Sequence, residues 1–310
     1  MSIRDFPNYS DDTSDMDDIE EDDFDEDLTD EAVNNLEKML QKLFGHPGFR
    51  TKEQKEAVQT MLKGKQDLVC LMPTGSGKSL VYQLPAVIKS KKVTVVICPL
   101  LALVQDQINQ LALKEIVAKT IHSKMSENEK KSVIKDCANK HPSLRLLYVT
   151  PEMAASASFN NLIETMMAQN TLACFVVDEA HVLTSWGNTF RPDYLKLGEL
   201  RLKTGSVPWA ALTATATPSC AKKIATTLNL KNGFKTIKLP SYRDNLYYDV
   251  VTKDVEDKDT LDNLLAFLFD KLGEENDCAI VYCRKKVATE KLANELTSRG
   301  LLSKAYHAGL

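Results

Sequence analysis

The chain has 310 residues, 43% of them hydrophobic and 26% charged, which is ordinary for a soluble globular protein but more than one hydrophobic core usually supports. No apolar run reaches the roughly 18 residues that a membrane-spanning helix needs, and no secretory pattern opens the chain, so we expect an intracellular protein without a membrane partner. The seven cysteines lie mostly in apolar runs without a Cys-x-x-Cys pair, which argues against disulfides and predicts no zinc site.

The formal net charge of −4 is unevenly distributed along the chain. Residues 1–31 hold 15 of the 43 acidic residues and one of the 39 basic ones, a charge of −14, which leaves +10 on the remainder. We expect residues 1–30 to form a disordered acidic tail. The basic remainder fits a polyanion such as nucleic acid, and the tail either solvates the chain, competes with that polyanion or docks on a protein partner.

Helical spacing predicts a first helix over residues 33–43, which Thr29 or Asp30 would cap. A second helix follows the segment 49–54 and runs on through Ala57, Val58, Met61 and Leu62 to Gly64. Beyond it, five short runs rich in Val, Ile and Leu lack polar alternation and predict buried strands: 67–72, 93–98, 145–149, 172–177 and 209–212.

Longer segments with helical spacing lie between most of these strands, as at residues 101–113 and 127–138. This alternation is typical of an α/β fold, a parallel sheet with helices on both faces. Ligands bind such sheets beyond the carboxyl ends of the strands, and each motif described below lies at such an end.

A Gly-rich turn from Met72 to Ser79 follows the first strand and opens onto a helix. Gly75 and Gly77 allow consecutive backbone N–H groups to point at phosphate oxygens, and the helix adds its positive N-terminal end. Lys78 would reach the β- and γ-phosphates, and the Ser79 hydroxyl would ligate Mg²⁺. Met72 stands where the pattern usually has Gly or Ala. The loop predicts an ATP site whose nucleotide contacts come from Thr74, Gly75, Ser76, Gly77, Lys78 and Ser79.

Two adjacent carboxylates follow the strand at 172–177. Asp178 would hold Mg²⁺ through its water shell, and Glu179 would orient or deprotonate the water that attacks the γ-phosphate. His181 would connect this site to the threonine hydroxyls of residues 213–217. Together with Lys78, these three side chains are the predicted catalytic residues.

Gln54 lies 24 residues before the loop lysine, on the second predicted helix. Its amide offers a paired donor and acceptor that match the edge of adenine. We therefore expect Gln54 to select ATP among nucleotides.

These residues, in this order, resemble the superfamily-two helicases and specifically the RecQ family, over residues 40–310. The resemblance rests on Phe44-Gly45, Phe49-Arg50 with Gln54, and the segments 72–86, 99–107, 148–152, 178–181 and 186–194. The step from Arg50 to Gln54 and the phrase at residues 150–156 look like the animal RecQ-five branch. The resemblance implies a nuclear, ATP-dependent, 3′-to-5′ DNA helicase of repair and recombination that acts on single-stranded or forked DNA.

By the same resemblance, one aromatic-rich segment touches single-stranded DNA and couples it to ATP turnover. Aromatic rings stack on bases without reading their sequence, while arginine contacts phosphate. The segment departs from the family at Asn188 and Thr189, where His and Asp are usual. The predicted DNA contacts are Gln105, Trp186, Phe190, Arg191 and Tyr194.

We expect three parts: the acidic tail at 1–30, a first RecA-like helicase domain that binds ATP at 31–237, and an incomplete, marginally stable second RecA-like domain at 238–310. The second would place a strand at 278–282 between two helices. Because the resemblance finds no arginine finger or zinc module here, a form that binds ATP and single-stranded DNA without unwinding is the alternative. An RNA helicase of the Asp-Glu-Ala-His type is a third possibility, which the aromatic segment disfavours.

Overall fold

The structure is a computed structural model that describes residues 35–122, 125–184, 192–194, 196–214, 217–240, 242–243, 245–250, 260–273, 277–307 and 309. The expected acidic tail at 1–30 lies outside these residues. The chain divides into two compact units, Met1–Tyr242 and Arg243–Leu310. None of the helices in the described ranges is both long enough and apolar enough to cross a membrane.

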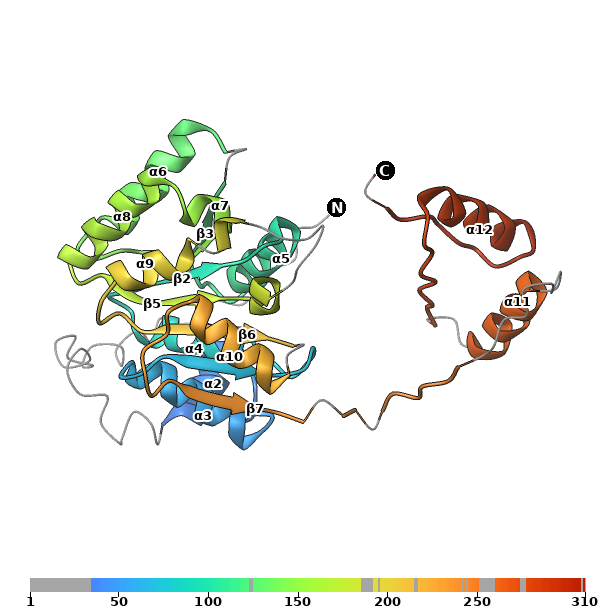
Figure 1. The fold of residues 1–310 in the computed structure, drawn as a ribbon, viewed down its shortest axis with the longest axis horizontal. Helices are drawn as coiled ribbons and strands as arrows, with labels where there is room; N and C mark the ends of the chain where they lie inside the picture. Colours follow the sequence, from blue (N-terminus) through green and yellow to red (C-terminus); the bar gives the residue numbers. More distant parts are fainter. Residues whose placement is uncertain are drawn as a thin grey trace, which may run out of the picture. The chain divides into compact units, whose positions relative to one another are not determined.

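The described residues of the first unit form one seven-stranded sheet in the order β3-β4-β2-β5-β6-β1-β7, in which every pairing is parallel (Figure 1). The strands are β1 (Leu68–Leu71), β2 (Val93–Ile97), β3 (Ala118–Ile121), β4 (Leu146–Val149), β5 (Leu172–Val177), β6 (Trp209–Thr213) and β7 (Lys235–Lys238). Since all strands run the same way, their carboxyl ends meet at one edge of the sheet.

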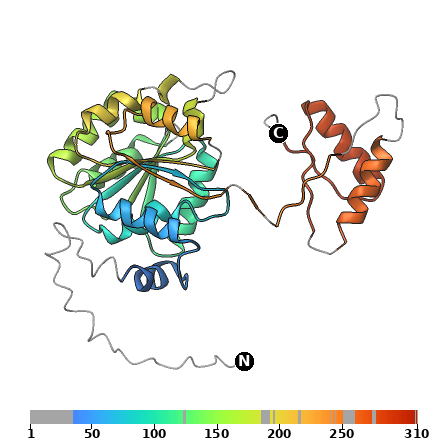
Figure 2. The same cartoon turned by 60° about the horizontal axis from the view of Figure 1, so that its bottom comes forward.

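Helices cover both faces of this sheet (Figures 1 and 2). One face packs against α2 (Leu36–Phe44), α3 (Lys52–Lys63), α4 (Leu80–Ile88) and α5 (Leu101–Ala112). The other packs against α6 (Glu127–Cys137), α7 (Pro151–Ala154), α8 (Ala157–Ala168), α9 (Leu197–Lys203), α10 (Pro218–Thr227) and the 3₁₀ helices η1 (Ala180–Thr184) and η2 (Pro192–Tyr194). The predicted α/β architecture, a RecA-like parallel sheet with helices on both faces, is confirmed.

The five predicted strands are present, but β3 and β7 were not predicted. Both are edge strands, each paired to a single neighbour. Lys119 in β3 and Lys238 in β7 are exposed, so neither strand has the continuous apolar run of a central strand. Edge strands of this kind carry a weak sequence signal because only one of their faces is buried.

Local capping sets the ends of the helix that precedes the site. The Thr51 hydroxyl accepts a hydrogen bond from the Gln54 backbone N–H at 3.1 Å and caps the start of α3. Gly64 ends the helix at φ +59°, a left-handed conformation that glycine adopts without a Cβ penalty. For α2, Asn35 takes the cap position without a side-chain bond, and the expected caps Thr29 and Asp30 lie outside the described residues.

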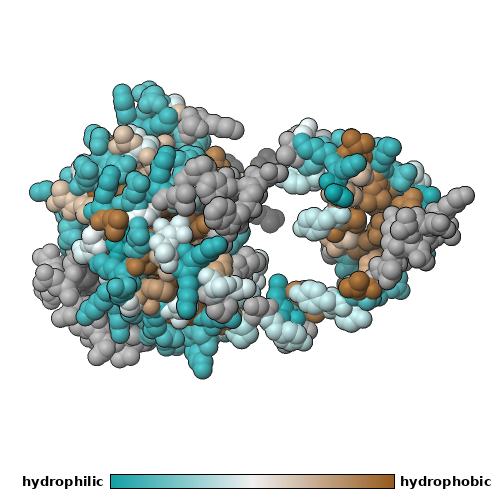
Figure 3. All heavy atoms as spheres, viewed as in Figure 1, coloured by the Kyte–Doolittle hydropathy of each residue, from teal (hydrophilic) through white to brown (hydrophobic). Residues whose placement is uncertain are grey.

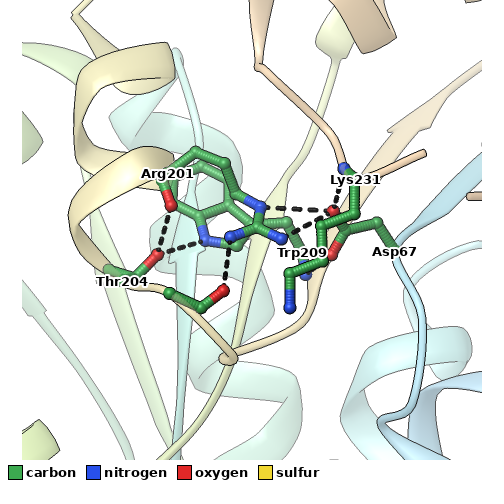
Figure 4. A network of polar contacts seen from close by, with 6 residues as sticks. Asp67, Arg201, Thr204, Trp209 and Lys231 are labelled. Carbon is green, nitrogen blue, oxygen red and sulfur yellow. Dashed lines mark hydrogen bonds and ion pairs between the residues drawn. The ribbon is translucent and has the colours of Figure 1, made fainter.

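A buried ion pair fixes the amino ends of β1 and β6 (Figure 4). Asp67 and Arg201 have side chains only 1% and 3% exposed, and the Arg201 Nη2 atom donates to Asp67 Oδ2 at 2.8 Å. The same carboxylate accepts from the backbone N–H of Trp209 at 2.9 Å and of Lys231 at 2.8 Å. Because the charges and the backbone donors satisfy one another, the pair can stay buried.

Asp67→Ala should lower the free energy of unfolding by about 3–5 kcal/mol, because it leaves the buried Arg201 guanidinium and the backbone N–H groups of Trp209 and Lys231 without their acceptor. Urea unfolding followed by circular dichroism measures this change. The matched control is Glu37→Ala, which breaks the 2.8 Å exposed pair with Lys55 and should cost less than about 1 kcal/mol. Equal effects from the two substitutions would show that Asp67 does not anchor the sheet.

The described part of the second unit contains two helices, α11 (Thr260–Lys271) and α12 (Lys286–Ser298), which share a small core of Leu265, Leu268 and Leu296. The strand predicted at 278–282 is wrong: this segment forms no strand. A strand needs a hydrogen-bonded neighbour, and the described residues of this unit provide none. Ile280 is accordingly 79% exposed and Tyr282 91% exposed, and hydrophobic residues show on the surface of this unit (Figure 3).

Candidate nucleotide-binding site

The strand order brings three separate motifs to one place. β5, β6 and β1 are neighbours, so the glycine loop after β1, Asp178 after β5 and Thr213 at the end of β6 leave the sheet side by side. Backbone pairing continues past the strand ends, since the Met72 N–H donates to the Thr213 carbonyl at 3.0 Å and the Asp178 N–H to that of Ile97 at 2.9 Å. The position of each motif is therefore fixed by the sheet itself.

The loop between β1 and α4 has the backbone of a phosphate cradle. Gly75 and Gly77 both have φ +82°, a conformation that other residues rarely adopt. A Cβ at Gly77 would also lie 2.4 Å from the Gln54 Nε2 atom. Met72, by contrast, is fully buried in the core and is not among the positive-φ residues, so this position does not need the usual glycine.

Arg50 and Gln54 hold the loop from the side of α3. The Gln54 Nε2 atom donates to the carbonyls of Gly77 at 3.1 Å and Ser76 at 3.3 Å, and its Oε1 atom accepts from the Arg50 backbone N–H at 2.8 Å. The Arg50 guanidinium donates to the Gly75 carbonyl. Both amide hydrogens of Gln54 are thus used within the protein, and contact with adenine requires that the amide exchange these partners.

Sequence reasoning placed Arg50 in a motif but did not assign it this contact with the loop. The available signal was its distance of four residues from Gln54, across the start of α3. Arg50 lies just before the N-cap Thr51 and Gln54 lies in the first turn of α3, close enough for the Gln54 side chain to accept the Arg50 backbone N–H.

Lys78 and Ser79 stand at the junction of the loop and α4. The Ser79 side chain makes no capping bond to the helix, so its oxygen has no helical role. The Lys78 charge acts on Asp178 and lowers the pKa of that carboxyl, which shows that the two side chains are near each other. A lysine charge, a hydroxyl and a carboxylate converge on the same end of the loop.

This oxygen-donor set fits Mg²⁺ bound together with a nucleotide. Within the described ranges, no group of three or more His, Cys, Asp or Glu side chains is arranged to hold a metal ion by itself. Mg²⁺ typically binds through one or two protein oxygens, with phosphate and water completing its shell. Ser79 and Asp178 are the residues that would hold the ion.

Glu179 is held in an unusual backbone conformation with φ +51°. Left-handed backbone at a residue other than glycine costs roughly 1–2 kcal/mol, and such strain clusters at functional sites. Its Oε2 atom lies 3.2 Å from His181 Nδ1, which also lies 3.1 Å from the Thr213 hydroxyl. The contact expected between His181 and the threonine segment is present, and it connects the carboxylate pair to the end of β6.

Burial, with a smaller contribution from the neighbouring Glu179 charge, raises the pKa of Asp178 to about 6. The backbone hydrogen bond from Glu179 and the charges of Lys78 and His181 act in the opposite direction. A carboxylate that is ionised at neutral pH in a buried place binds a cation readily, because the cation replaces its lost hydration.

The predicted DNA contacts fall into three groups. Gln105 is exposed on α5, where its Nε2 atom donates to Asn109 Oδ1 at 3.0 Å. Trp186, Phe190 and Arg191 lie outside the described residues. Tyr194 is buried, at 1% exposure, in the core under the α8 and α9 face. Its ring cannot stack on a base in this position, so the structure corrects its predicted role to one in packing.

Gly77→Ala should weaken the binding of a fluorescent ATP analogue by at least about tenfold, because the new methyl group meets the Gln54 amide and a left-handed φ disfavours alanine by about 1–2 kcal/mol. Gly45→Ala is the matched control, since Gly45 has φ +71° but nothing within 4 Å of its Cβ position. The control should lose stability but keep its nucleotide affinity. Unchanged affinity in Gly77→Ala would refute the proposed shape of the cradle.

Asp178→Asn should stabilise the protein at pH 7 in EDTA by about 1–3 kcal/mol. At this pH the buried Asp178 side chain carries a charge that folding removes from water, and the neutral asparagine avoids that cost. The folded-state pKa of about 6 lies above the unfolded value, so the penalty of ionisation fades as pH falls through 6 and is absent below about pH 4. Urea unfolding at pH 4 and pH 7 measures this difference. The control is Glu127→Gln, at an exposed carboxylate, which should not increase the free energy of unfolding at pH 7. If Asp178→Asn also fails to increase it, the burial assigned to Asp178 is contradicted.

The DEAD/DEAH box helicase family model matches residues 51–224. ATP-dependent DNA helicase Q5 of Rattus norvegicus is 46% identical over 277 residues, which cover 87% of this chain and 28% of that protein. RecQ-like DNA helicase BLM of Xenopus laevis is 40% identical over 274 residues, 88% of this chain and 20% of that protein. The chain therefore spans between 20% and 28% of the length of these relatives.

Among solved structures, DUF1998 helicase MrfA bound to DNA has a TM-score of 0.64 and 18% identity, over 88% of this chain and 38% of that one. This likeness shows a shared helicase fold. The family match and the identity to RecQ helicases agree with the motif order read from the sequence. The chain belongs to the DEAD/DEAH box helicase family, and the relatives to which it is similar are named ATP-dependent DNA helicase Q5 and RecQ-like DNA helicase BLM.

Proposed function

We propose that the first unit binds ATP with Mg²⁺ and serves as the ATP-binding half of a 3′-to-5′ DNA helicase. The observation that carries this proposal is the convergence of the glycine loop, Asp178 and Thr213 at the carboxyl ends of three neighbouring strands. Parallel α/β sheets bind their ligands at this edge.

Each residue of the site has a role that follows from its chemistry. The loop backbone and Lys78 hold the phosphates, while Ser79 and Asp178 hold Mg²⁺, which neutralises charge on the phosphates. Glu179 orients the attacking water or takes its proton. His181, through its contact with Thr213, connects the site to the segment that follows β6.

Gln54 has two sets of partners in this proposal. In the structure its amide bonds the carbonyls of Ser76 and Gly77. An amide can exchange those acceptors for the edge of adenine, which also offers a donor and an acceptor. Selection of ATP by Gln54 would then be coupled to release of the loop.

Unwinding is proposed for the whole protein to which these residues belong. Helicase Q5 and BLM are named as DNA helicases, and this chain matches 28% and 20% of their lengths. For that protein we propose that DNA is the partner, that it acts in DNA repair and recombination, and that it is located in the nucleus. The acidic segment at residues 1–30 is proposed as a docking segment for a protein partner.

The rival is a form that binds ATP and single-stranded DNA but does not unwind. The described residues of the second unit favour it, since they form two helices and no sheet. Hydrolysis in such motors is accelerated roughly 10³- to 10⁵-fold by an arginine finger, so binding and turnover are separable properties.

The test is ATP binding and DNA-stimulated hydrolysis by residues 1–310, with Lys78→Ala as the variant. Loss of the lysine should reduce nucleotide affinity by about tenfold or more and abolish any hydrolysis, because a charge-assisted contact to phosphate is removed. Lys55→Ala, which removes an exposed lysine of α3, is the matched control. Hydrolysis that DNA stimulates and Lys78→Ala abolishes would exclude the binding-only form, and stimulation by RNA alone would overturn the assignment to DNA.

A further inference from the structure

Two tyrosine hydroxyls are buried near Ser79 and Asp178, the residues that would hold Mg²⁺; we call this part of the site its metal end. Tyr82 on α4 and Tyr148 on β4 are each 1% exposed, and neither hydroxyl has a hydrogen-bond partner of acceptable geometry. Neither residue was predicted to be functional. Buried polar atoms nearly always have a partner, so two such hydroxyls close together require an explanation.

Tyr82 lies within reach of Ser79. It is three residues further along α4, and its backbone N–H donates to the Ser79 carbonyl at 3.2 Å. Side chains of a helix lean toward its N-terminal turn, so the Tyr82 ring lies against the turn that carries Ser79. The Ser79 hydroxyl and the Tyr82 hydroxyl are therefore neighbours at the start of α4.

The sheet places Tyr148 and Asp178 on the same face. Val96 of β2 pairs with Tyr148 of β4 on one side and with Val176 of β5 on the other. Asp178 is two residues beyond Val176, and side chains alternate with a period of two along a strand. Tyr148 and Asp178 thus both belong to the face that α4 covers.

The pKa values agree with this placement. Burial, and after it the neighbouring Tyr148 and Asp178, raise the pKa of Tyr82 well above its ordinary value. Burial raises the pKa of Tyr148 to about 12. A tyrosine hydroxyl can donate one hydrogen bond and accept another.

Gln83 ties this group to the neighbouring helix. Its side chain is largely buried, and its Nε2 atom donates to the Gln107 Oε1 atom of α5 at 2.8 Å. That bond joins the beginning of α4 to α5, next to the residue that carries the Tyr82 hydroxyl.

We propose that Tyr82 and Tyr148 are positioning residues for Ser79: Tyr82 Oη accepts the Ser79 hydroxyl hydrogen, Tyr148 Oη accepts that of Tyr82, and a Ser79 lone pair is thereby turned toward Mg²⁺. This inference rests on the proposed function of the site. It adds two residues to the metal end that touch neither nucleotide nor metal. It also gives both buried hydroxyls a partner in the metal-bound protein.

The test measures the affinity of residues 1–310 for a fluorescent ATP analogue in EDTA and in excess Mg²⁺, for the wild type, Tyr82→Phe, Tyr148→Phe and the double variant. Phenylalanine keeps the ring and removes only the hydroxyl. Tyr82→Phe should reduce the Mg²⁺-dependent gain in affinity about five- to tenfold and leave the affinity in EDTA within about twofold. Since the hydroxyls act in series, the double variant should lose no more than Tyr82→Phe alone.

Tyr194→Phe is the matched control, because Tyr194 is equally buried but lies in the core of the other face. It should keep the full Mg²⁺-dependent gain. Equal Mg²⁺ dependence in the wild type, Tyr82→Phe and Tyr148→Phe would overturn the inference, as would an equal loss in EDTA and in Mg²⁺. If the wild type shows no ATP binding that depends on Lys78, the proposed function fails and the inference with it.

Discussion

The position of β1 between β6 and β7 is the constraint on which the site depends. β1 pairs in register with β6, from Leu68 opposite Ala210 to Leu71 opposite Thr213, so the loop leaves the sheet beside the end of β6. At the other end, the Asp67 carboxylate bonds the backbone N–H groups at the start of β6 and before β7. Because these strands are only four or five residues long, one buried ion pair at their amino ends also determines where their carboxyl ends lie.

The site itself is built from groups that oppose folding. Asp178 is buried as an ionisable carboxyl, Glu179 has a left-handed backbone, and Tyr82 and Tyr148 bury hydroxyls without partners. The surrounding structure offsets these costs with two extensive core layers, one on each face of the sheet. A ligand that neutralises the carboxylate and gives the hydroxyls partners recovers part of that free energy, so binding and stability are coupled at this edge.

Much of the fold could be predicted from the sequence because central parallel strands are buried on both faces. Runs such as Leu172–Val177 are continuously apolar, and a length of six residues favours a buried strand over a buried helix. Edge strands such as Ala118–Ile121 escape this reasoning, since their exposed lysines break the pattern. The apolar run at 278–282 shows the converse limit: composition favours a strand there, but a strand exists only where a neighbour completes its hydrogen bonds.

The positions of the site residues could be predicted, whereas their partners could not. The order of motifs places Lys78 and Asp178 at strand ends, and a parallel sheet then brings those ends together. The hydrogen bond from Gln54 to the loop depends on the angle at which α3 packs against the sheet. The spacing of residues along the sequence does not reveal that angle. Tyr82 and Tyr148 are 66 residues apart in the chain and read as ordinary core residues. Only the pairing of β4 with β2, with α4 above them, brings two such hydroxyls to the metal end of one loop.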